Sequence, residues 1–279
     1  MTACWRLIRP HQWLKNLMIF FPAFLSGSIV QPGVAQRGVL PMIAFCLGSS
    51  ATYVFNDLLD APRDRNHPRK SRRPIASGMV RPRSAVIFAL LLVVGALGIA
   101  LLVPGIFPVL LVSYLLISVC YSLKLKDVAI VDIFCIAAGF ILRLEAGGGT
   151  LGVTISEWLF LTVFLLSVFL STGKRLCEQR GLGEGAGFHR KSLDGYPPGF
   201  LDIAMAMTGA AVLVTYTMYS LSKAYLIYTV PLCTFGLFRY ALRVKAGEGG
   251  DPTEALLKDF PLFVTGLLWV IMVASGIYR

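Results

Sequence analysis

The chain has 279 residues, of which 56% are hydrophobic and only 15% are charged, against roughly 25% charged residues in soluble domains. Its mean hydropathy of +0.71 excludes a water-soluble enzyme, a disordered chain and a small disulfide scaffold. The charges are unbalanced, with 26 Lys and Arg against 15 Asp and Glu, which gives a net charge of +11. The positions of these basic residues should therefore indicate their role.

Nine apolar stretches are long enough to form membrane-spanning helices, which need about 20 such residues each. They are residues 17–35, 39–57, 84–103, 106–122, 128–145, 157–173, 200–219, 224–240 and 260–277. Because these stretches take up most of the chain, we expect a single all-α transmembrane domain over residues 1–279. The first stretch has no small-residue cleavage site, so we expect it to be a helix rather than a removable signal peptide.

The loops between the nine stretches carry Lys and Arg very unevenly. If the N-terminus is cytoplasmic and the helices alternate, 22 of the 26 basic residues lie on the cytoplasmic side and Arg143 lies within a helix. Only Arg37, Lys223 and Arg279 then lie outside. Since cytoplasmic loops are enriched in basic residues, the pattern predicts nine spans with the N-terminus inside and the C-terminus outside.

The segment before the first span, Arg9–Asn16, contains one Trp and two basic residues. Its composition is typical of an amphipathic anchor on anionic lipid. Lys15 and Asn16 enter the first span, so they could instead bind the phosphate of an anionic lipid. The composition is compatible with both interpretations.

A polar run begins at the cytoplasmic end of the second span. Asn56, Asp60 and Asp64 are spaced four residues apart, so they should form one stripe of oxygen atoms if the helix continues through Pro62. Oxygen ligands in a row suit Mg²⁺, which completes its coordination with water and substrate phosphate. Acidic residues at a membrane boundary are costly and tend to be functional.

Basic residues follow the acidic ones directly. They form a closely spaced set of hydrogen-bond donors for phosphate oxygens: Arg65, His67, Lys70 and Arg73. Acidic groups for a metal, followed by basic groups for phosphate, predict a diphosphate-binding site. The alternative is a solvated cytoplasmic loop, which would explain the basic residues but not the three Asp.

A second polar run joins the fourth and fifth spans. It contains Tyr121, Ser122, Lys126 and Asp132, with Arg143 eleven residues later. Asp132 and Arg143 should share a helix face after three turns and point into the bundle. They could form structural ion pairs with other helices, and Lys126 could be only a topology signal.

A third polar group, Gly173-Lys174-Arg175, ends the sixth span. Its two basic side chains could bind either a substrate phosphate or lipid headgroups. The sequence does not decide between these two partners.

Taken together, these motifs resemble the UbiA superfamily of intramembrane prenyltransferases, and within it the polyprenyl-phosphate phosphoribosyltransferase group. That group's pattern N-D-x-x-D-x-x-x-D-R-x-H-P-x-K-x-x-R-P is met without a gap from Asn56 to Pro74. The other matching positions are Arg9–Asn16, Tyr121, Ser122, Leu125, Lys126, Asp132, Gly139, Phe140, Arg143, Gly173–Arg175 and Gly195–Pro198. The resemblance covers nearly the whole chain in the expected order.

The resemblance implies transfer of 5-phosphoribose from phosphoribosyl diphosphate (PRPP) to a decaprenyl-type polyprenyl phosphate, towards a lipid-linked arabinose donor. The implied metal ligands for Mg²⁺ are Asn56, Asp57, Asp60 and Asp64, and the implied catalytic residues are Asp57, Asp60, Asp64, Lys70 and Lys126. The implied substrate-binding residues are Lys15, Asn16, Asn56, Arg65, His67, Arg73, Tyr121, Ser122, Asp132, Arg143, Lys174 and Arg175. The implied location is the inner membrane of a bacterium, as a multi-pass protein with its active site facing the cytoplasm.

Two departures from the wider superfamily bear on the substrate. A second D-x-x-x-D motif is absent, because Asp127 and Asp132 have four residues between them, and Asp64-Arg65-x-His67-Pro68 replaces the usual Arg-Thr. Both departures disfavour an aromatic acceptor. A prenyl diphosphate donor with a small acceptor remains the alternative, and a lipid carrier or transporter is a weaker one. We expect no nucleic-acid partner, while a homo-oligomer is possible.

Overall fold

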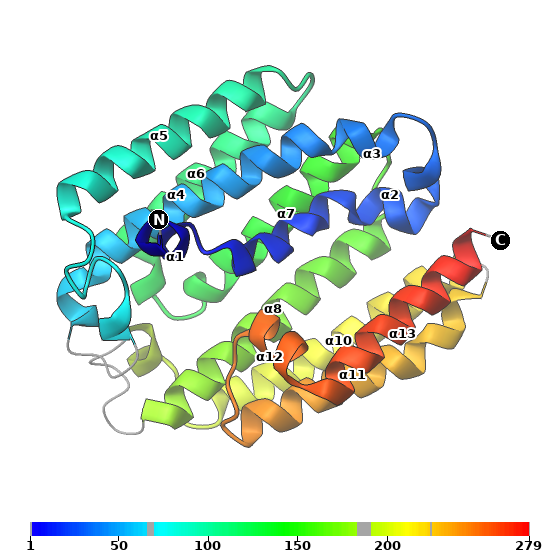
Figure 1. The fold of residues 1–279 in the computed structure, drawn as a ribbon. Coiled ribbons are helices and arrows are strands. Elements are labelled where there is room, and N and C mark those ends of the chain that lie inside the picture. The colour runs from blue at the N-terminus through cyan, green and yellow to red at the C-terminus, as the bar shows by residue number, and fades with distance from the viewer. Residues whose placement is uncertain (1, 66–69, 183–190, 224, 279) are drawn as a thin grey trace. The chain divides into compact units, whose positions relative to one another are not determined.

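The computed structural model describes residues 2–65, 70–182, 191–223 and 225–278. All the regular elements in these ranges are helices, and the same ranges contain no strand (Figure 1). The predicted all-α architecture is therefore confirmed.

The long helices follow the apolar stretches. They are α4 (Val39–Asp64), α5 (Pro82–Leu101), α6 (Phe107–Leu123), α7 (Val131–Leu151), α8 (Glu157–Leu182), α10 (Phe200–Leu221), α11 (Val230–Lys245) and α13 (Phe260–Ile277). The shorter elements are α1 (Thr2–Ile8), η1 (Pro10–Phe20), α2 (Phe21–Ser26), η2 (Ser28–Val30), α3 (Val34–Arg37), η3 (Lys70–Arg72), η4 (Leu125–Asp127), η6 (Lys191–Gly195), η7 (Leu226–Thr229) and α12 (Pro252–Lys258). Each predicted stretch after the first contains most of a long helix, and several helices extend further than predicted. The stretch 224–240 differs at its start, where residue 224 lies outside the described residues and η7 precedes α11.

The first predicted stretch, residues 17–35, is not one α-helix. It begins inside the 3₁₀ helix η1, passes through α2 and ends in α3. Gly27 and Gly33 both have φ +80°, a conformation that interrupts a right-handed helix.

Within the described residues, five helical segments are long and apolar enough to cross a membrane: Val34–Asp64, α5, residues 157–181 of α8, α10 and α13. Helix α6 is also apolar but shorter. These segments support a multi-pass membrane protein. The count of nine spans and the cytoplasmic N-terminus remain predictions.

The chain forms two compact units. The first comprises Met1–Ala23, Ile29–Lys126 and Leu142–Thr154, and the second comprises Phe24–Ser28, Asp127–Ile141 and Ile155–Arg279. Helix α7 contributes to both units. The single-domain organisation expected from the sequence remains a prediction.

In the first unit, α4 packs along α5 and α6 (Figure 1). Phe45 of α4 lies at the centre of the buried core, with ring centroids 5.9 Å from Phe107 and 5.3 Å from Tyr114. Gly147 of α7 allows η1 to approach closely, because a Cβ there would lie 2.1 Å from the carbonyl oxygen of Ile19. These contacts fix the helices that carry the first polar motif.

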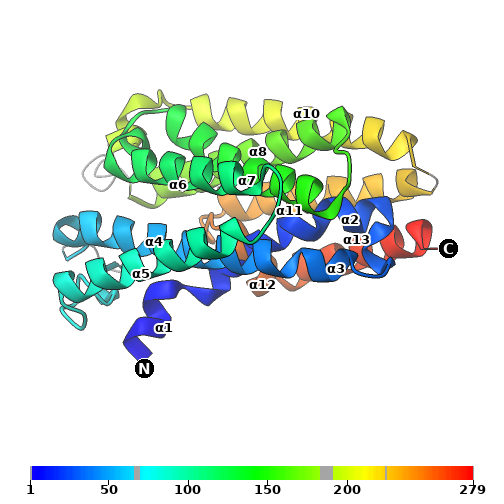
Figure 2. The same ribbon diagram turned by 90° about the horizontal axis from the view of Figure 1, so that it is seen from above.

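In the second unit, α10 lies beside α8, and α11 packs on α8 and α13 (Figure 2). Tyr240 of α11 lies against Gly173 of α8, where a Cβ would come within 2.7 Å of its ring. The Tyr240 hydroxyl donates to the carbonyl oxygens of Leu170 and Gly250, both at 2.9 Å. The glycine of the Gly-Lys-Arg motif is therefore needed for packing.

The start of α13 is held by Asp259, whose carboxylate accepts the backbone N–H of Leu262. The same carboxylate also accepts from Arg239 at 2.8 Å and from Arg243 at 2.7 Å. The hydrogen bonds from Arg239, reinforced by that from Arg243, hold the pKa of Asp259 well below its ordinary value. Asp259 is thus both a helix cap and an ionised partner of α11.

Candidate active site

The C-terminal end of α4 carries the first polar motif. The helix continues through Pro62 to Asp64, as the predicted stripe required. However, a step of four residues advances about 40° beyond a full helical turn, whereas a step of seven falls about 20° short of two turns. Asp64 therefore lies nearer in direction to Asp57 than to Asn56. The expected single stripe is accordingly split into two pairs.

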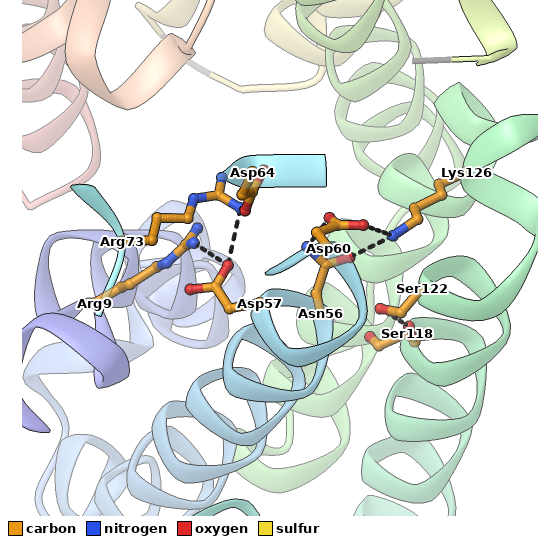
Figure 3. Close-up of polar contacts among 9 residues, drawn as sticks. All are labelled: Arg9, Asn56, Asp57, Asp60, Asp64, Arg73, Ser118, Ser122 and Lys126. Carbon is orange, nitrogen blue, oxygen red and sulfur yellow. Dashed lines mark hydrogen bonds and ion pairs between the residues drawn. The ribbon is translucent and has the colours of Figure 1, made fainter. Parts of the chain in front are cut away.

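The first pair is Asn56 and Asp60, which face Lys126 (Figure 3). The Asn56 side-chain amide donates to Asp60 Oδ2 at 2.9 Å. Lys126 Nζ donates to Asp60 Oδ1 at 2.6 Å and to Asn56 Oδ1 at 3.1 Å. Lys126 lies in η4, so this contact joins two motifs that are 66 residues apart.

The second pair is Asp57 and Asp64, which are 2% and 3% exposed. Arg73 Nη1 donates to Asp57 Oδ1 at 3.0 Å and to Asp64 Oδ2 at 2.7 Å. Arg9 Nη2 donates to the same Oδ1 of Asp57 at 2.6 Å (Figure 3). Each carboxylate of the first motif is therefore bonded to at least one basic side chain.

The donor set is suited to a hard divalent cation, because it consists of three carboxylates and an amide oxygen on one helix end. Among the described residues, no three His, Cys, Asp or Glu gather into a ready-made metal cluster. The carboxylates would have to exchange basic partners for metal. The predicted Mg²⁺ ligands fit by chemistry and remain a prediction.

Other predicted residues of the first motif lie at the edge of this cluster or outside the described residues. Arg65 is exposed just after α4. Lys70 begins η3 and lies close enough to Asp64 for a favourable electrostatic interaction. His67 lies outside the residues that the structure describes.

Tyr121 and Ser122 lie at the end of α6. Tyr121 is half-buried, whereas Ser122 is buried and donates to the Ser118 carbonyl oxygen of its own helix at 2.9 Å. This bond occupies the Ser122 hydroxyl hydrogen within α6.

Asn16 and Arg143 meet inside the first unit. Arg143 Nε donates to Asn16 Oδ1 at 2.7 Å, and its Nη2 donates to the Tyr114 hydroxyl at 3.1 Å. The guanidinium carbon lies 4.5 Å from the Tyr114 ring centroid and 5.5 Å from that of Phe45, within cation–π range. Asn16 is fully buried and also bonds Ser49. This cluster fixes η1 against α4 and α7.

Lys15, next to Asn16 in η1, is half-buried. Lys174 in α8 forms an ion pair with Asp251 at 3.3 Å, and its side chain remains 35% exposed. Both lysines therefore keep some access to the surroundings of the helices.

A second buried network lies in the second unit. Arg175 Nε donates to Asp132 Oδ2 at 2.6 Å, and the two side chains are 1% and 0% exposed. Ser192 also donates to Asp132 Oδ2, at 3.1 Å, while Arg175 Nη1 bonds Glu178 at 2.6 Å. Asp132 and Arg143 lie on the same helix but contact different residues. Asp132 pairs with Arg175 of α8, which is the ion pair with another helix that the sequence offered as an alternative to substrate binding.

Tyr196 completes this network. Its hydroxyl donates to Asp132 Oδ1 and accepts the backbone N–H of Ile130, both at 2.7 Å. Burial, together with the bond to Asp132, raises the pKa of Tyr196, so its phenol stays protonated and can donate at neutral pH. Ile130 has φ +68°, which is rare for a β-branched residue, and the bond to Tyr196 holds it there.

The sequence assigned no role to several residues of these clusters, namely Arg9, Tyr114, Glu178, Ser192 and Tyr196. Tyr196 lies in the Gly-Tyr-Pro-Pro motif, whose presence was the signal that could have found it. Arg9 opens the Arg9–Asn16 motif, but the sequence alone gave no reason to place it against Asp57.

The fold and the motif positions now define a class. The model of the UbiA prenyltransferase family matches residues 19–267, and the chain therefore belongs to that family. This membership confirms the prediction of an enzyme and disfavours the carrier and transporter alternatives.

Two relatives that match nearly the whole chain carry a narrower name than the family does. The decaprenyl-phosphate phosphoribosyltransferase of Mycolicibacterium smegmatis is 31% identical over 98% of this chain and 92% of its own length. That of Corynebacterium glutamicum is 32% identical over 98% and 86%. A UbiA homologue from Archaeoglobus fulgidus, solved bound to GPP and Mg²⁺, superposes with a TM-score of 0.78 over 99% of this chain and 100% of its own, at 18% identity. This last likeness shows the fold alone.

Proposed function

We propose that the protein transfers 5-phosphoribose from PRPP to a polyprenyl phosphate of the decaprenyl type and releases diphosphate. The observation that carries this proposal is its similarity, from end to end, to two relatives named decaprenyl-phosphate phosphoribosyltransferase. The first-motif cluster supports it, because carboxylates and basic groups that converge on one helix end suit a metal-bound diphosphate.

In the proposed reaction the bond between C1 of the ribose and the diphosphate oxygen breaks. A new bond forms between C1 and an oxygen of the lipid phosphate, and the electron pair of the broken bond leaves with diphosphate. Attack from the opposite side inverts the configuration at C1. The lipid phosphate is already ionised at neutral pH, so no strong general base is required.

The roles follow from charge. Asn56, Asp57, Asp60 and Asp64 would hold Mg²⁺, which would neutralise charge on the leaving diphosphate. The diphosphate oxygens would be bound by the basic residues Lys70, Arg73 and Lys126. Arg65 and His67, which precede Lys70 in the sequence, would assist. These groups stabilise the charge that develops as C1 acquires oxocarbenium character.

The acceptor phosphate needs basic groups with access to the lipid. Lys15 of the first unit and Lys174 of the second are separate candidates for this role, and each fits it better than Arg175, because Arg175 is 1% exposed and bonded to two carboxylates. We assign Arg175, Asp132 and Arg143 to holding the helices in place. Tyr121 and Ser122, at the C-terminal end of α6, would line the binding site for the acceptor.

The proposal includes a location. Nine spans with the N-terminus inside, in the inner membrane of a bacterium, would place the first motif at the cytoplasmic face, where PRPP is available. The product would supply a lipid-linked arabinose donor. The excess of basic residues on one side of the predicted topology supports this orientation.

A second candidate is transfer from a prenyl diphosphate to a small acceptor, which the description of the matching family as prenyltransferases favours. A donor assay separates the two. Purified protein in nanodiscs receives radiolabelled PRPP, Mg²⁺ and polyprenyl phosphate, and labelled lipid is extracted into organic solvent. Labelled lipid supports the proposal. Folded protein that makes none, but transfers a labelled prenyl group to an aromatic acid, contradicts it.

A further inference from the structure

Arg9 converges with Arg73 on a single atom of the first motif. Both guanidinium groups donate to Oδ1 of Asp57, at 2.6 Å from Arg9 and 3.0 Å from Arg73. Arg73 also bonds Asp64, whereas the acidic partner of Arg9 is Asp57. The two groups therefore approach one point from different parts of the chain, 64 residues apart.

The backbone of Arg9 is in an unfavourable conformation. Its φ of +50° and ψ of +64° are left-handed, which is uncommon for a residue with a side chain. The next residue is Pro10, and a residue before proline normally prefers an extended conformation. Such conformations persist where surrounding contacts fix them, and they concentrate at functional sites.

The contacts that fix Arg9 come from α4. The indole of Trp13 donates to Ser50 Oγ at 3.0 Å, and that hydroxyl donates to the Ile8 carbonyl oxygen at 2.9 Å. The Arg9 guanidinium also lies over the Tyr53 ring, 5.2 Å from its centroid. The segment on both sides of Arg9 is thus attached to α4, and its side chain is directed towards Asp57.

Exposure distinguishes Arg9 from a purely structural partner. Its side chain is 21% exposed, similar to that of Arg73 at 24%, whereas the buried Arg175 is 1% exposed. Arg9 and Arg73 can therefore both be reached by a ligand. If Asp57 ligates a metal, its Oδ1 can no longer serve two guanidinium groups fully, and both need another anion.

We propose that Arg9 is a further substrate-binding residue, which binds an oxygen of the donor's diphosphate beside Arg73. This inference rests on the proposed function for the site, but it requires only a diphosphate-bearing donor. Paired guanidinium groups bind phosphate oxygens well because their donors form a planar fork. The N-terminal segment would then contribute directly to donor binding.

The test compares Arg9→Gln, Arg9→Lys and wild type in nanodiscs, with Arg6→Gln as the matched control. Arg6 lies in the same N-terminal segment and is exposed, and Arg6→Gln removes one positive charge, as Arg9→Gln does. The first probe is inorganic pyrophosphate with Mg²⁺, whose dissociation constant is measured by calorimetry. The second is the KM for PRPP and for polyprenyl phosphate.

We expect Arg9→Gln to weaken pyrophosphate binding about tenfold or more, as the loss of a charge-assisted hydrogen bond predicts. The KM for PRPP should rise in parallel, while the KM for polyprenyl phosphate and the Arg6→Gln variant stay near wild type. Unchanged pyrophosphate binding in folded Arg9→Gln would overturn the inference. If Arg9→Gln does not fold, Arg9→Lys is measured instead, because it keeps the positive charge but removes the planar guanidinium group. Weaker pyrophosphate binding by Arg9→Lys would then support the inference, and unchanged binding would overturn it.

The binding measurement also separates the two proposals. Weaker pyrophosphate binding by Arg9→Gln, in a protein that transfers no phosphoribose, would retain Arg9 as a diphosphate ligand and reject PRPP as donor. Phosphoribosyl transfer by the wild type, together with unchanged pyrophosphate binding by Arg9→Gln, would retain PRPP as donor and reject Arg9 as a diphosphate ligand.

Discussion

Arg175 and Asp132 form an ion pair that is almost completely removed from solvent, with 2.6 Å between Nε and Oδ2. The pair joins α8 to the first turn of α7, and Tyr196 and Ser192 bond the same carboxylate. Because Arg175, Ser192 and Tyr196 are all buried, the network fixes three segments of the second unit against one another.

Removing one member of this pair should destabilise the protein. Asp132→Asn would leave the Arg175 charge without its main buried partner, and breaking such a pair costs about 3–5 kcal/mol. We expect a lower thermal unfolding midpoint in detergent, followed by loss of the monodisperse peak on size exclusion. Glu178→Gln is the control, because the Glu178 side chain is 30% exposed and its pairing should matter less.

The double variant Asp132→Leu, Arg175→Met tests whether the buried ion pair is a replaceable structural contact. Replacing a buried pair by apolar residues is often neutral or stabilising, so this variant should be more stable than Asp132→Asn. If it is equally unstable, the account of the pair as a replaceable structural contact is wrong.

Asp60→Asn should reduce turnover to about 1% of wild type or less. The substitution keeps the size of the side chain but removes the charge that Lys126 bonds and that the metal would need. We expect kcat to fall by about two orders of magnitude or more with little loss of stability, as measured by the donor assay and by thermal unfolding. Glu157→Gln, an exposed change at the start of α8, should behave as wild type. Full activity in Asp60→Asn would remove the first motif from the mechanism.

Asp259 should make stability depend on acid. Its pKa is lowered in the folded protein, so its contribution is complete above the unfolded value of about 4 and is lost as the pH falls towards the folded pKa. We expect the unfolding midpoint of wild type to decline below about pH 4 more steeply than that of Asp259→Asn.

The Asn variant keeps the cap on Leu262 while removing the charge that Arg239 and Arg243 bond. Asp259→Ala should lose about 1 kcal/mol more at neutral pH because it also removes the cap. Parallel acid curves for wild type and Asp259→Asn would show that the ion pairs contribute nothing.

Gly147→Ala should be strongly destabilising. The added methyl would lie 2.1 Å from the Ile19 carbonyl oxygen, which belongs to backbone and cannot rotate away. We expect a loss of about 1–3 kcal/mol or more, from the unfolding midpoint in detergent. Gly149→Ala, on the same helix, meets nothing nearer than Ile106 Cγ2 at 3.4 Å, so it should be neutral or stabilising through helix propensity.

Much of the fold followed from the sequence because apolar length is a direct signal. The stretch at 39–57 and the one at 260–277 are helices in the structure, and the pairing of Asp60 with Lys126 joins two motifs that were predicted to act together. The sequence left open whether the helix continues through Pro62, and in the structure it does. These features depend on local composition and spacing, which a sequence displays.

Three features did not follow, for physical reasons. The angular drift of α4 places Asp64 with Asp57, which a count of four residues per turn conceals. The break at Gly27 depends on its backbone angles. The contact of Arg9 with Asp57 joins residues 48 apart through a left-handed residue, which no local pattern indicates.

The first-motif cluster has a thermodynamic consequence. Asp57, Asp60 and Asp64 are matched by Arg9, Arg73 and Lys126, so each carboxylate that accepts a new cation must first release a basic group. An anion that binds the released groups lowers that cost, and a cation that binds the carboxylates does the same for the anion. Binding of the two should therefore be mutually reinforcing, and linkage requires that each raises the affinity of the other by the same factor.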